Sequence, residues 1–551
     1  MDELCKIIKD QGGVLFEKRG SLLSLWQEIA DNFYPERADF TITRNLGDEF
    51  ARNLMTSYPV LARRDLGNSI SSILRPSNKT WMHIRTVENW DKLGIEAKAW
   101  LQWAENRMRR AMQHRTSQFT RATKEGDHDY ASFGQNVIQT TLNSTATGLL
   151  YRCWHIRDVA WCEDENGMAT TVYRKWKPTV RELAKIFGRD KLSDKARQSL
   201  ENNKPNEEVQ VWHVVAPLDV LSAGAKTKMP FRSVYIDLDS NHIIEDVGVH
   251  EQEYNVARWQ TVSGSQYAYS PASIIALPDA RLIQSMTAVL LEAGEKAVTP
   301  PMVAVQEAIR GDINLFAGGI TYADDVYDER LGEVLRPLTI DRSGVPLGLE
   351  MQQDTRAMIA EAFYLNKLTL PAPGTDMTAY EVGQRIQEYI RQAMPLFEPM
   401  EAEYNAPLCE RTFSLMMRAG AFGSPYEMPE ELRAQDIMFA FESPLHDALE
   451  REKGQRFLEA SQMLAQAVAL DPSSKHTVDA PKALRDVLTA VGVPAAWVRP
   501  ESQVKELIAA ENAQMEAAQT LQTMQQGADV VATIAGASPT QPTGEIINAG
   551  V

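Results

Sequence analysis

Cysteine is scarce in this sequence, and long uninterrupted apolar runs are missing. None of the four cysteines belongs to a CxxC pair: Cys5, Cys153, Cys162 and Cys409. Only Cys153 has a histidine close by, at His155, so the spacing argues against a zinc site and is typical of free thiols in a reducing cytosol. Neither a run of 18 apolar residues nor an apolar signal-peptide core occurs, and we therefore expect no membrane-spanning helix and no signal peptide.

Catalytic motifs are also missing. The sequence contains no GxxxxGKS/T phosphate-binding loop, no HExxH zinc motif, no GxGxxG after a strand and no GxSxG nucleophile turn. The first absence excludes a P-loop ATPase. We expect no enzymatic activity, no cofactor and no metal site.

Positive charge is under-represented. The chain has 57 Lys and Arg against 74 Asp and Glu, for a net charge of -17. Residues 371–551 hold 25 acidic and 13 basic residues, which accounts for -12 of that charge. A sequence-specific DNA-binding protein usually shows a basic excess, so this class is disfavoured. The length predicts several folding units rather than one core.

Residues 1–125 predict mainly helices. Apolar residues recur at helical spacing before Pro35 and again over residues 95–114. The second segment carries basic residues that would either touch DNA phosphates or, as we favour, form a solvated helix face: Arg107, Arg109, Arg110 and Arg115. Four tryptophans would either stack on bases or, as we favour, pack in a core: Trp81, Trp90, Trp100 and Trp103.

Residues 130–270 predict a mixed α+β region. Asn166-Gly167 lies between two β-prone runs, which predicts a hairpin with a type I′ turn and positive φ at both central positions. Thr179 and Glu182 form a capping box that opens a short helix ending near Gly188. A further strand pair is expected to turn near residues 240–241.

Three acidic clusters invite a metal-binding interpretation. They are Asp127-His128-Asp129, Glu163-Asp164-Glu165 and Asp324-Asp325. Adjacent side chains diverge on any regular element, so we interpret the first as a surface turn, and the second and third as solvated acids. Cys153 and Cys162 would either lie on neighbouring strands or, as we favour, be separate core or surface thiols.

Two long helices flank an insertion later in the chain. Ser270-Pro271 suits a helix start, and apolar residues then recur at helical spacing over residues 271–298, a length of roughly 42 Å. Pro278 is expected to kink the first turns, and residues 299–301 end the helix. After a glycine-containing insertion with β-prone runs, a second helix is predicted over residues 349–368. The two helices are expected to lie antiparallel.

The remainder predicts a loop and then more helices. Residues 370–376 are rich in helix breakers, and Thr378 with Glu381 forms a second capping box before a long helix. Prolines at 395 and 399 predict a bend. Three helices follow over residues 445–470, 480–491 and 501–526, and residues 536–551 read as a flexible tail.

Several stretches, in order, resemble the head-to-tail connecting (portal) protein family of short-tailed phages. The resemblance runs from about residue 20 to 430 and departs from the usual pattern at Gln266 and Ala268. The stretches that carry it are SLWQEIADNFYPERADF, RRDLGNSISSILRPSNKTWMHIR, DYASFGQNVIQTT, ENGMATTVYRKWKPTVRELAKIFG, YAYSPASIIALPDARLIQ with TPPMV, and DMTAYEVGQRIQE.

The resemblance implies a mostly α fold with an α+β wing, assembled as a ring that is twelve-fold in this family. It assigns the wing to residues 1–270, two stem helices to 271–298 and 349–369, and the clip to 299–348 between them. Residues 370–440 would form a channel loop and long post-stem helices, 441–535 a helical crown, and 536–551 the tail.

The implied function is that of a conduit for DNA packaging and ejection at one capsid vertex of the virion, with assembly in the host cytoplasm. The implied partners are double-stranded DNA without sequence specificity, terminase, tail adaptors at the clip, and capsid and scaffolding proteins. The implied channel loop contains Pro371, Pro373, Gly374, Thr375 and Asp376. Four basic residues would contact phosphates or form ion pairs between subunits: Arg281, Lys296, Arg356 and Lys367.

Two other classes remain open. A DNA-pumping large terminase would need the missing phosphate-binding loop. Another virion structural protein, such as a tail adaptor or an internal core protein, would also lack catalytic motifs, but the pattern of helix, insertion and helix argues against it.

Overall fold

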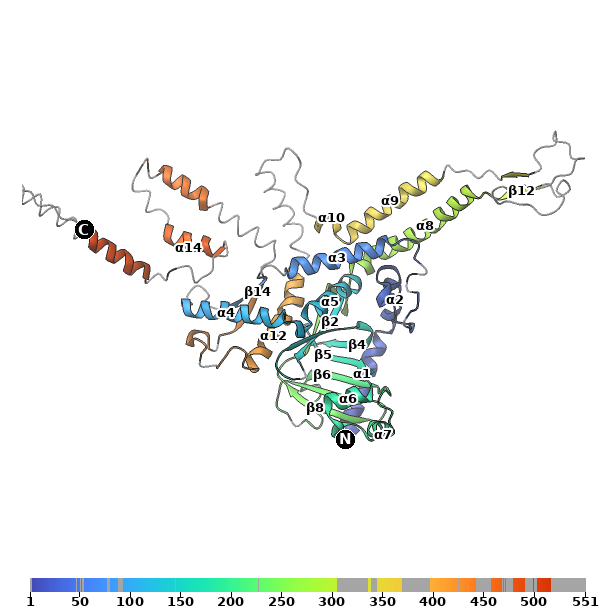
Figure 1. The fold of residues 1–551 in the computed structure, drawn as a ribbon, viewed down its shortest axis with the longest axis horizontal. Coiled ribbons are helices and arrows are strands. Elements are labelled where there is room, and N and C mark those ends of the chain that lie inside the picture. The colour runs from blue at the N-terminus through green and yellow to red at the C-terminus, as the bar shows by residue number, and fades with distance from the viewer. Residues whose placement is uncertain are drawn as a thin grey trace, which may run out of the picture. The chain divides into compact units, whose positions relative to one another are not determined.

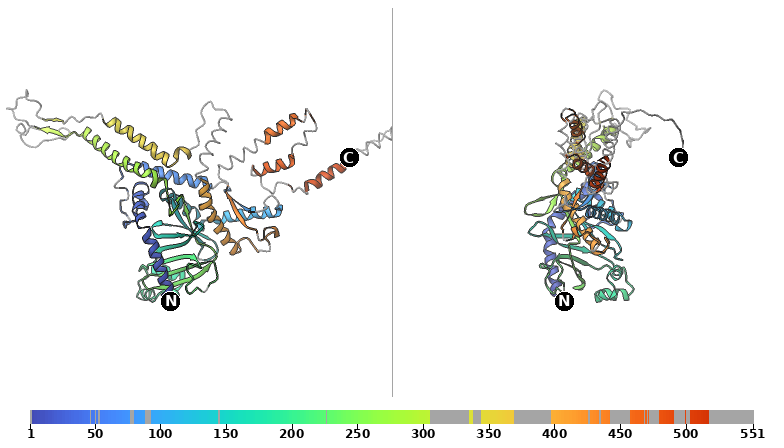
Figure 2. Two further views of the ribbon diagram at one scale, coloured as in Figure 1. Left: turned by 180° about the vertical axis from the view of Figure 1, so that it is seen from behind. Right: turned by 90° about the vertical axis from the view of Figure 1, so that its left-hand side faces the viewer.

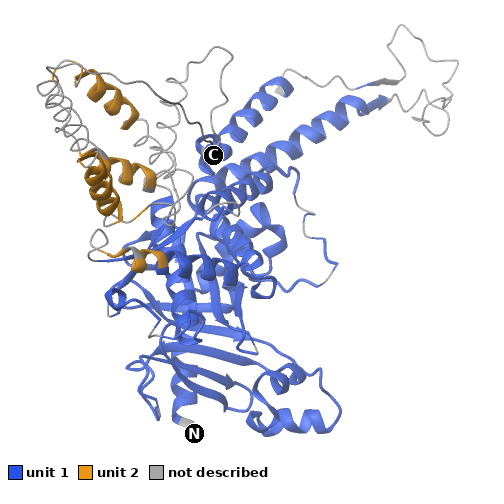
Figure 3. Ribbon diagram, turned by 60° about the vertical axis from the view of Figure 1, so that its left-hand side comes forward, with its two compact units in different colours: residues 1–91, 100–449 blue, residues 92–99, 450–551 orange. Residues whose placement is uncertain are grey.

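The computed structural model describes most of the chain. The described residues are 2–304, 335–337, 344–368, 397–441, 457–467, 469, 471, 479–490, 499 and 503–516, apart from gaps at 46, 50, 52–53, 77–79, 88–92, 144, 226, 425–426 and 434. Two compact units divide it (Figure 3): residues 1–91 with 100–449, and residues 92–99 with 450–551.

The first unit begins with helices, as the sequence predicts. These are α1 (Asp2–Lys18), α2 (Gly20–Phe33), α3 (Tyr58–Leu74), α4 (Ile95–Met112, which starts in the second unit) and α5 (Phe119–Phe133). Strand β1 (Met82–Thr86) pairs antiparallel with β14 (Ile437–Phe441), with Met82 opposite Phe441. Segments about 350 residues apart in sequence therefore share one small sheet.

Two antiparallel sheets form the centre of this unit. One has the strand order β3-β2-β9, from Leu149–Trp154, Gln135–Leu142 and Tyr254–Arg258. The other is a five-stranded meander made of β4 (Val159–Glu163), β5 (Ala169–Trp176), β6 (Val211–Pro217), β7 (Phe231–Asp237) and β8 (His242–Val249). The first unit is therefore a mixed α+β fold, and its two main sheets lie within residues 130–270, where an α+β region was predicted.

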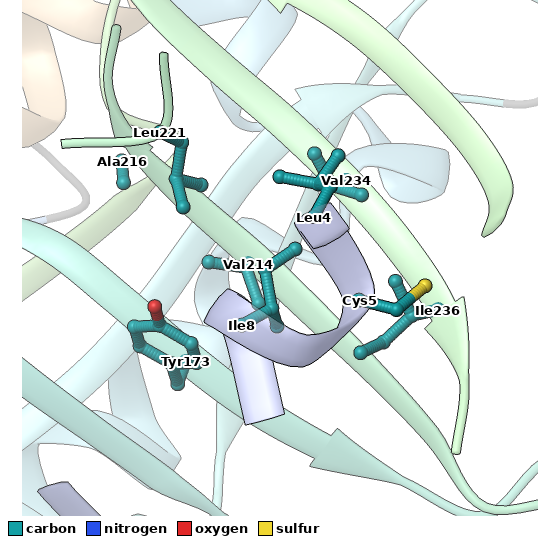
Figure 4. Packing of buried hydrophobic residues seen from close by; sticks show 9 residues of the cluster. All are labelled: Leu4, Cys5, Ile8, Tyr173, Val214, Ala216, Leu221, Val234 and Ile236. Carbon is teal, nitrogen blue, oxygen red and sulfur yellow. The ribbon is translucent and has the colours of Figure 1, made fainter. Parts of the chain in front are cut away.

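The five-stranded sheet is covered by helices on both faces. Leu4, Cys5 and Ile8 of α1 pack against Val214 and Val234 on one face (Figure 4). On the other face, α6 (Val180–Phe187) and α7 (Asp194–Glu201) bury Leu183 and Ala196 against Val211 and Ile244. Neighbouring residues of β6 thus serve opposite cores, as the side-chain alternation of a strand requires. Figure 2 shows α1 and the α6–α7 pair on opposite sides.

Local signals in this sheet are confirmed in part. Thr179 and Glu182 make the predicted capping box, and α6 ends at Gly188. The strand turn before β8 has Asn241 at a φ of +50°, as left-handed turn positions require.

The hairpin between β4 and β5 also forms, but its turn was predicted wrongly. The Gly167 amide donates to the Asp164 carbonyl at 3.1 Å, and only Gly167 has a positive φ, at +75°. This is a type I turn followed by a left-handed glycine. The Asp164 side chain is the reason, because it accepts from the Asn166 and Met168 amides at 2.9 Å each and holds Asn166 right-handed.

A pair of long helices leaves the first unit (Figure 1). The β10–β11 hairpin (Gln260–Val262 and Ser265–Tyr269) leads to a π-helical turn (Ala272–Ala276) and then to α8 (Leu277–Val298). Ser270 Oγ accepts from the Ser273 amide at 3.1 Å, which confirms the predicted helix start. The π-helical turn lies directly before Pro278, whose missing N–H and bulky ring disturb the regular hydrogen bonds.

The chain returns toward the sheets through a strand and two helices, of which the longer, α9, has 19 residues against 22 in α8. Strand β12 (Met302–Ala304) pairs antiparallel with β13 (Leu335–Pro337), and α9 (Gly344–Ala362) and α10 (Leu365–Leu368) lead back. The predicted second helix, residues 349–368, forms but begins earlier and is broken into α9 and α10 at Tyr364, which has a φ of +56°. Most of the predicted insertion, including Asp324-Asp325, lies outside the described residues, as does the capping box at 378–381.

Helices continue toward the C-terminus. A π-helical turn (Glu401–Asn405) and α12 (Ala406–Arg418) belong to the first unit. In the second unit, α14 (Ala480–Ala490) and the helical residues 457–467 and 503–516 lie inside the three predicted helices.

Gly134 occupies a position that only glycine fits. It ends α5 with a φ of +75°, and a Cβ built there would lie 2.5 Å from the Tyr269 carbonyl carbon. We expect Gly134→Ala to lower the free energy of unfolding by at least about 2 kcal/mol, from backbone strain and overpacking. Gly13→Ala is the control, because Gly13 lies inside α1 with nothing within 4 Å of an added Cβ. It should raise stability by about 0.5–1 kcal/mol. Equal effects of both variants in urea unfolding would contradict this reading.

Candidate functional site: the exposed helical pair

The helical pair consists of residues 272–298 and residues 344–362. The two helices pack against each other with few polar contacts between them. Gln352 Nε2 of α9 donates to Thr287 Oγ1 of α8 at 2.7 Å. Gly348 lies against Leu290, since an added Cβ would stand 2.9 Å from the Leu290 Cδ2. The close approach and the antiparallel β12–β13 pairing beyond it make α8 and α9 one arm that runs out and back.

The root of this arm is fixed to the N-terminal helices. Gln284 donates through Nε2 to the Thr56 carbonyl at 3.0 Å, and its Oε1 accepts from the Met55 and Thr56 amides at 2.7 and 3.0 Å. Phe363, at the end of α9, meets Phe33 of α2 with ring centroids 5.3 Å apart. Ile283 and Ile359 are fully buried there. The arm is therefore anchored at its base.

Further out, both helices expose large apolar side chains. Val289 is 63% exposed and Val298 is 83% exposed. Others between about half and two-thirds exposed are Leu282, Leu291, Leu347, Leu349, Met351 and Met358. Exposed apolar side chains in this number, along both helices of an isolated chain, mark a surface that another molecule covers, and we call this set the apolar stripe.

Residues 272–298 also form a helix long and apolar enough, by length and composition, to cross a membrane. The expectation of no such helix rested on uninterrupted apolar runs, which this mixed sequence does not have. Only 22% of its most apolar window is buried. A single helix of this kind is weak support for a membrane span, because a helix that packs in a protein assembly has the same composition.

Two of the four predicted phosphate-contacting residues are already paired with carboxylates. Arg281 Nε donates to Glu28 Oε1 at 2.5 Å, and Lys296 Nζ donates to Glu292 Oε1 at 2.5 Å. These pairs lie within one chain and are well exposed, so each contributes little to stability.

The other two predicted residues, Arg356 and Lys367, lie near tyrosine rings, and Arg356 also contacts a glutamine side-chain amide. Arg356 donates to Gln352 Oε1 at 3.4 Å, and its guanidinium lies 5.7 Å from the Tyr58 ring centroid. The Lys367 ammonium lies 5.6 Å from the Tyr364 ring centroid. Neither forms an ion pair with the residues that the structure describes. The predicted channel loop, Pro371 to Asp376, lies outside those residues.

The Asp127-His128-Asp129 cluster is not a surface turn, contrary to the sequence interpretation. All three residues lie on α5, and both aspartates are buried. Arg37 donates to both carboxylate oxygens of Asp129 at 2.9 and 3.0 Å, and Arg75 pairs with Asp127. Successive side chains diverge, as expected, but each acid meets an arginine from a distant segment that the sequence does not reveal.

The His128 ring is held neutral in this surrounding. Burial and the nearby Arg63 guanidinium lower the pKa of His128 to about 4. Its Nδ1 lies 3.1 Å from Arg63 Nη1. The cluster therefore stabilises the packing of α5 against α3 and does not form a metal-binding site. No group of three His, Cys, Asp or Glu side chains suited to a metal ion occurs in the described part of the chain.

The other sequence candidates are also structural. Glu163 pairs with Arg258, and Trp81 is buried between Phe119 and Phe441. Trp100 and Trp103 pack on Phe422, while Trp90 lies outside the described residues. Arg107, Arg110 and Arg115 are exposed, as a solvated helix face predicts. Cys153 and Cys162 are free thiols in different sheets.

One histidine–serine contact in the core resembles a catalytic pair but is inaccessible to solvent. His213 Nε2 lies 2.8 Å from Ser233 Oγ, as in a nucleophile–base pair. His213 is fully buried and stacks on Tyr235 at 3.8 Å, and Ser233 is only 6% exposed. Burial lowers the pKa of His213 well below its ordinary value. A substrate has no access, so this pair is a satisfied core contact.

The π-helical turn before α12 carries a pH-sensitive carboxyl. Burial and the neighbouring Glu398 raise the pKa of Glu401 from 4.5 to about 7. Folding therefore favours the protonated form, and stability is lost as the pH rises through the interval from about 4.5 to 7. We expect Glu401→Gln to remove this part of the pH dependence. The Tm of the wild type should fall more than that of the variant between pH 5 and 7.5, and parallel curves would contradict the assignment.

Comparison with known proteins places these features in a family. Residues 9–498 match the family described as bacteriophage head to tail connecting protein. The chain is 25% identical over 540 residues to the probable portal protein of Bordetella phage BPP-1, covering 96% of this chain and 95% of the relative. It is 23% identical over 542 residues to the portal protein of Salmonella phage epsilon15, with the same coverage.

A solved structure, the virion of a native gene transfer agent particle, aligns with 74% of this chain and 86% of its own, at 9% identity. Its TM-score of 0.33 is too low to carry an argument. The family match, in contrast, spans nearly the whole chain. The chain therefore belongs to the bacteriophage head to tail connecting protein family.

Proposed function

We propose that this chain is one subunit of a phage portal, a non-enzymatic ring at one capsid vertex of the virion through which DNA is packaged and ejected. The observation that carries the proposal is the apolar stripe on the helical pair, which the chain itself leaves uncovered. In a ring with head-to-tail contacts, each subunit covers the stripe of the next.

The sequence assignments fit this ring as follows. Residues 1–270 form the wing, residues 271–298 and 349–369 the stem, and residues 299–348 the clip, which contains the paired strands β12 and β13. Residues 370–440 supply the channel loop and the post-stem helices, 441–535 the crown and 536–551 a tail. The clip would bind tail adaptors, and the further partners would be terminase, capsid and scaffolding proteins.

The negative net charge of the chain supports a channel that lets DNA pass rather than one that binds it tightly. Twelve copies of a chain with a net charge of -17 carry roughly -200 charges, and duplex DNA has about one negative charge per 1.7 Å. Repulsion between the two would let any sequence pass without being held. Arg356 and Lys367 are the better candidates for transient phosphate contacts, because Arg281 and Lys296 already have carboxylate partners.

The channel loop is proposed to narrow the channel and resist backward slippage of DNA. Deletion of residues 371–376 should lower DNA retention in filled heads without preventing ring assembly. Unchanged retention would count against this role.

Native mass spectrometry of the purified chain tests the assembly. A species of about twelve subunits is expected. A single subunit at every concentration would contradict the proposal.

A further inference from the structure

A cleft opens on the α1 side of the five-stranded sheet. It measures about 1040 Å³ and lies between α1, the β4–β5 hairpin and the ends of β6 and β7. Its apolar floor includes Val14, Leu15, Val220 and Phe231, of which Val14 is 51% and Val220 40% exposed. A cleft of this size has room for several side chains.

The rim of this cleft is acidic. Asp10, Glu165 and Asp219 line it, are exposed, and form no ion pair with any described residue. No lysine or arginine is among its described lining residues. Glu163 also lines it but is already paired with Arg258. The occupant that fits is therefore an apolar side chain flanked by cations.

The opposite side of the same sheet presents such a surface. Lys185 and Ile186 are exposed on α6, Ile186 to 57%, and Arg189 is exposed in the short 3-10 turn that follows Gly188. Neither Lys185 nor Arg189 forms an ion pair within the described residues. Glu182, one turn before Ile186 on α6, is engaged in the capping box.

Other cations of this layer are not free in the same way. Lys191 pairs with Glu245 at 2.7 Å, and Lys195 lies 3.8 Å from Asp239. Lys185 and Arg189, in contrast, lie within three residues of Ile186 and have no carboxylate partner among the described residues.

We propose that α6 of one subunit docks into the acidic cleft of its neighbour, with Ile186 on the apolar floor and Lys185 and Arg189 facing the carboxylates of the rim. The inference rests on the proposed ring and names a contact within it. Because α1 and α6 cover opposite faces of one sheet, the contact joins two different surfaces. That is the head-to-tail geometry that a ring requires.

Charge reversal in the full-length chain tests the proposed ion pairs between α6 and the rim of the cleft. The cleft variant is Asp10→Lys with Asp219→Lys, and the helix variant is Lys185→Glu with Arg189→Glu. Each alone should raise the subunit concentration at which half the rings dissociate by about tenfold at low salt, and less at high salt. Combining the two variants should restore most of the loss. Equal losses that add in the combined variant would overturn the inference.

Cross-linking tests the contact directly. Cys162 lines the cleft and Ile186 is exposed on α6, so Ile186→Cys rings treated with a short bis-maleimide should give a ladder of linked subunits. Adding Cys162→Ser should abolish the ladder. Lys204→Cys, on an exposed position after α7, is the control and should give none.

The outcomes separate this contact from the proposed function. Wild-type rings that neither cross-link nor respond to charge reversal would overturn the docking of α6 and leave the portal assignment standing. A wild-type chain that forms no ring would contradict both. The thermal unfolding of each charge-reversal variant, measured alongside, should match the wild type because Asp10, Asp219, Lys185 and Arg189 are all exposed.

Discussion

Replacing Arg75 by methionine is expected to lower the free energy of unfolding by about 3–5 kcal/mol, the usual cost of leaving a buried charge without its partner. The Arg75 side chain is 3% exposed and that of its partner Asp127 is fully buried. Arg75 Nη1 also donates to Asn405 Oδ1 at 2.7 Å. One guanidinium thus ties α3 to α5 and to the turn before α12. Urea titration at fixed protein concentration measures the loss, since assembly adds a concentration-dependent contribution.

A matched surface pair provides the control. Arg121 pairs with Glu125 at 3.1 Å, with side chains 76% and 39% exposed. Arg121→Met should cost less than about 0.5 kcal/mol. Adding Asp127→Leu to Arg75→Met should recover part of the loss, because no buried charge then remains. A loss below about 1 kcal/mol for Arg75→Met would show that the pair is not what joins these segments.

Val289→Asp is expected to abolish ring formation while leaving the folded subunit intact. Val289 is 63% exposed in the isolated chain, so an aspartate there stays in water and costs the monomer little. In the ring the same side chain would be buried without a partner, which is costly. The subunit concentration needed for assembly should rise more than about 100-fold. Sedimentation velocity measures the shift, and circular dichroism measures the fold.

Val262→Asp is the corresponding control. Val262 is 51% exposed on β10, away from the apolar stripe of the helical pair. It should assemble like the wild type. If Val289→Asp assembled normally too, the stripe would not be the subunit interface.

Much of the fold follows from local signals. The capping box at Thr179, the serine start at Ser270 and the two long helices around an insertion were all predicted from residue spacing. These features depend on residues within one or two turns of each other, which is why sequence reasoning reaches them.

Features that depend on distant residues were predicted poorly. Asp127 and Asp129 were interpreted as surface residues because their partners, Arg75 and Arg37, are 52 and 92 residues away. The hairpin turn type depended on the Asp164 side chain, which competes with the preference of Asn166-Gly167. The strands of residues 130–270 were predicted only as an α+β region, because their order depends on pairings such as that of β2 with β9, more than 100 residues apart.

The candidate site likewise has features that local sequence predicts and features that depend on residues far apart in the chain. The helical pair was predicted, but the separation of its cations into paired and unpaired ones required the geometry. The acidic cleft brings together α1, a hairpin and two strand ends, so no sequence window contains it.

Electron microscopy of the purified full-length protein, with class averaging of end-on views, tests the central claim most directly. We expect a closed ring of about twelve subunits around a channel near the width of a DNA duplex. Particles that remain single subunits, or that assemble without a central channel, would contradict the portal assignment.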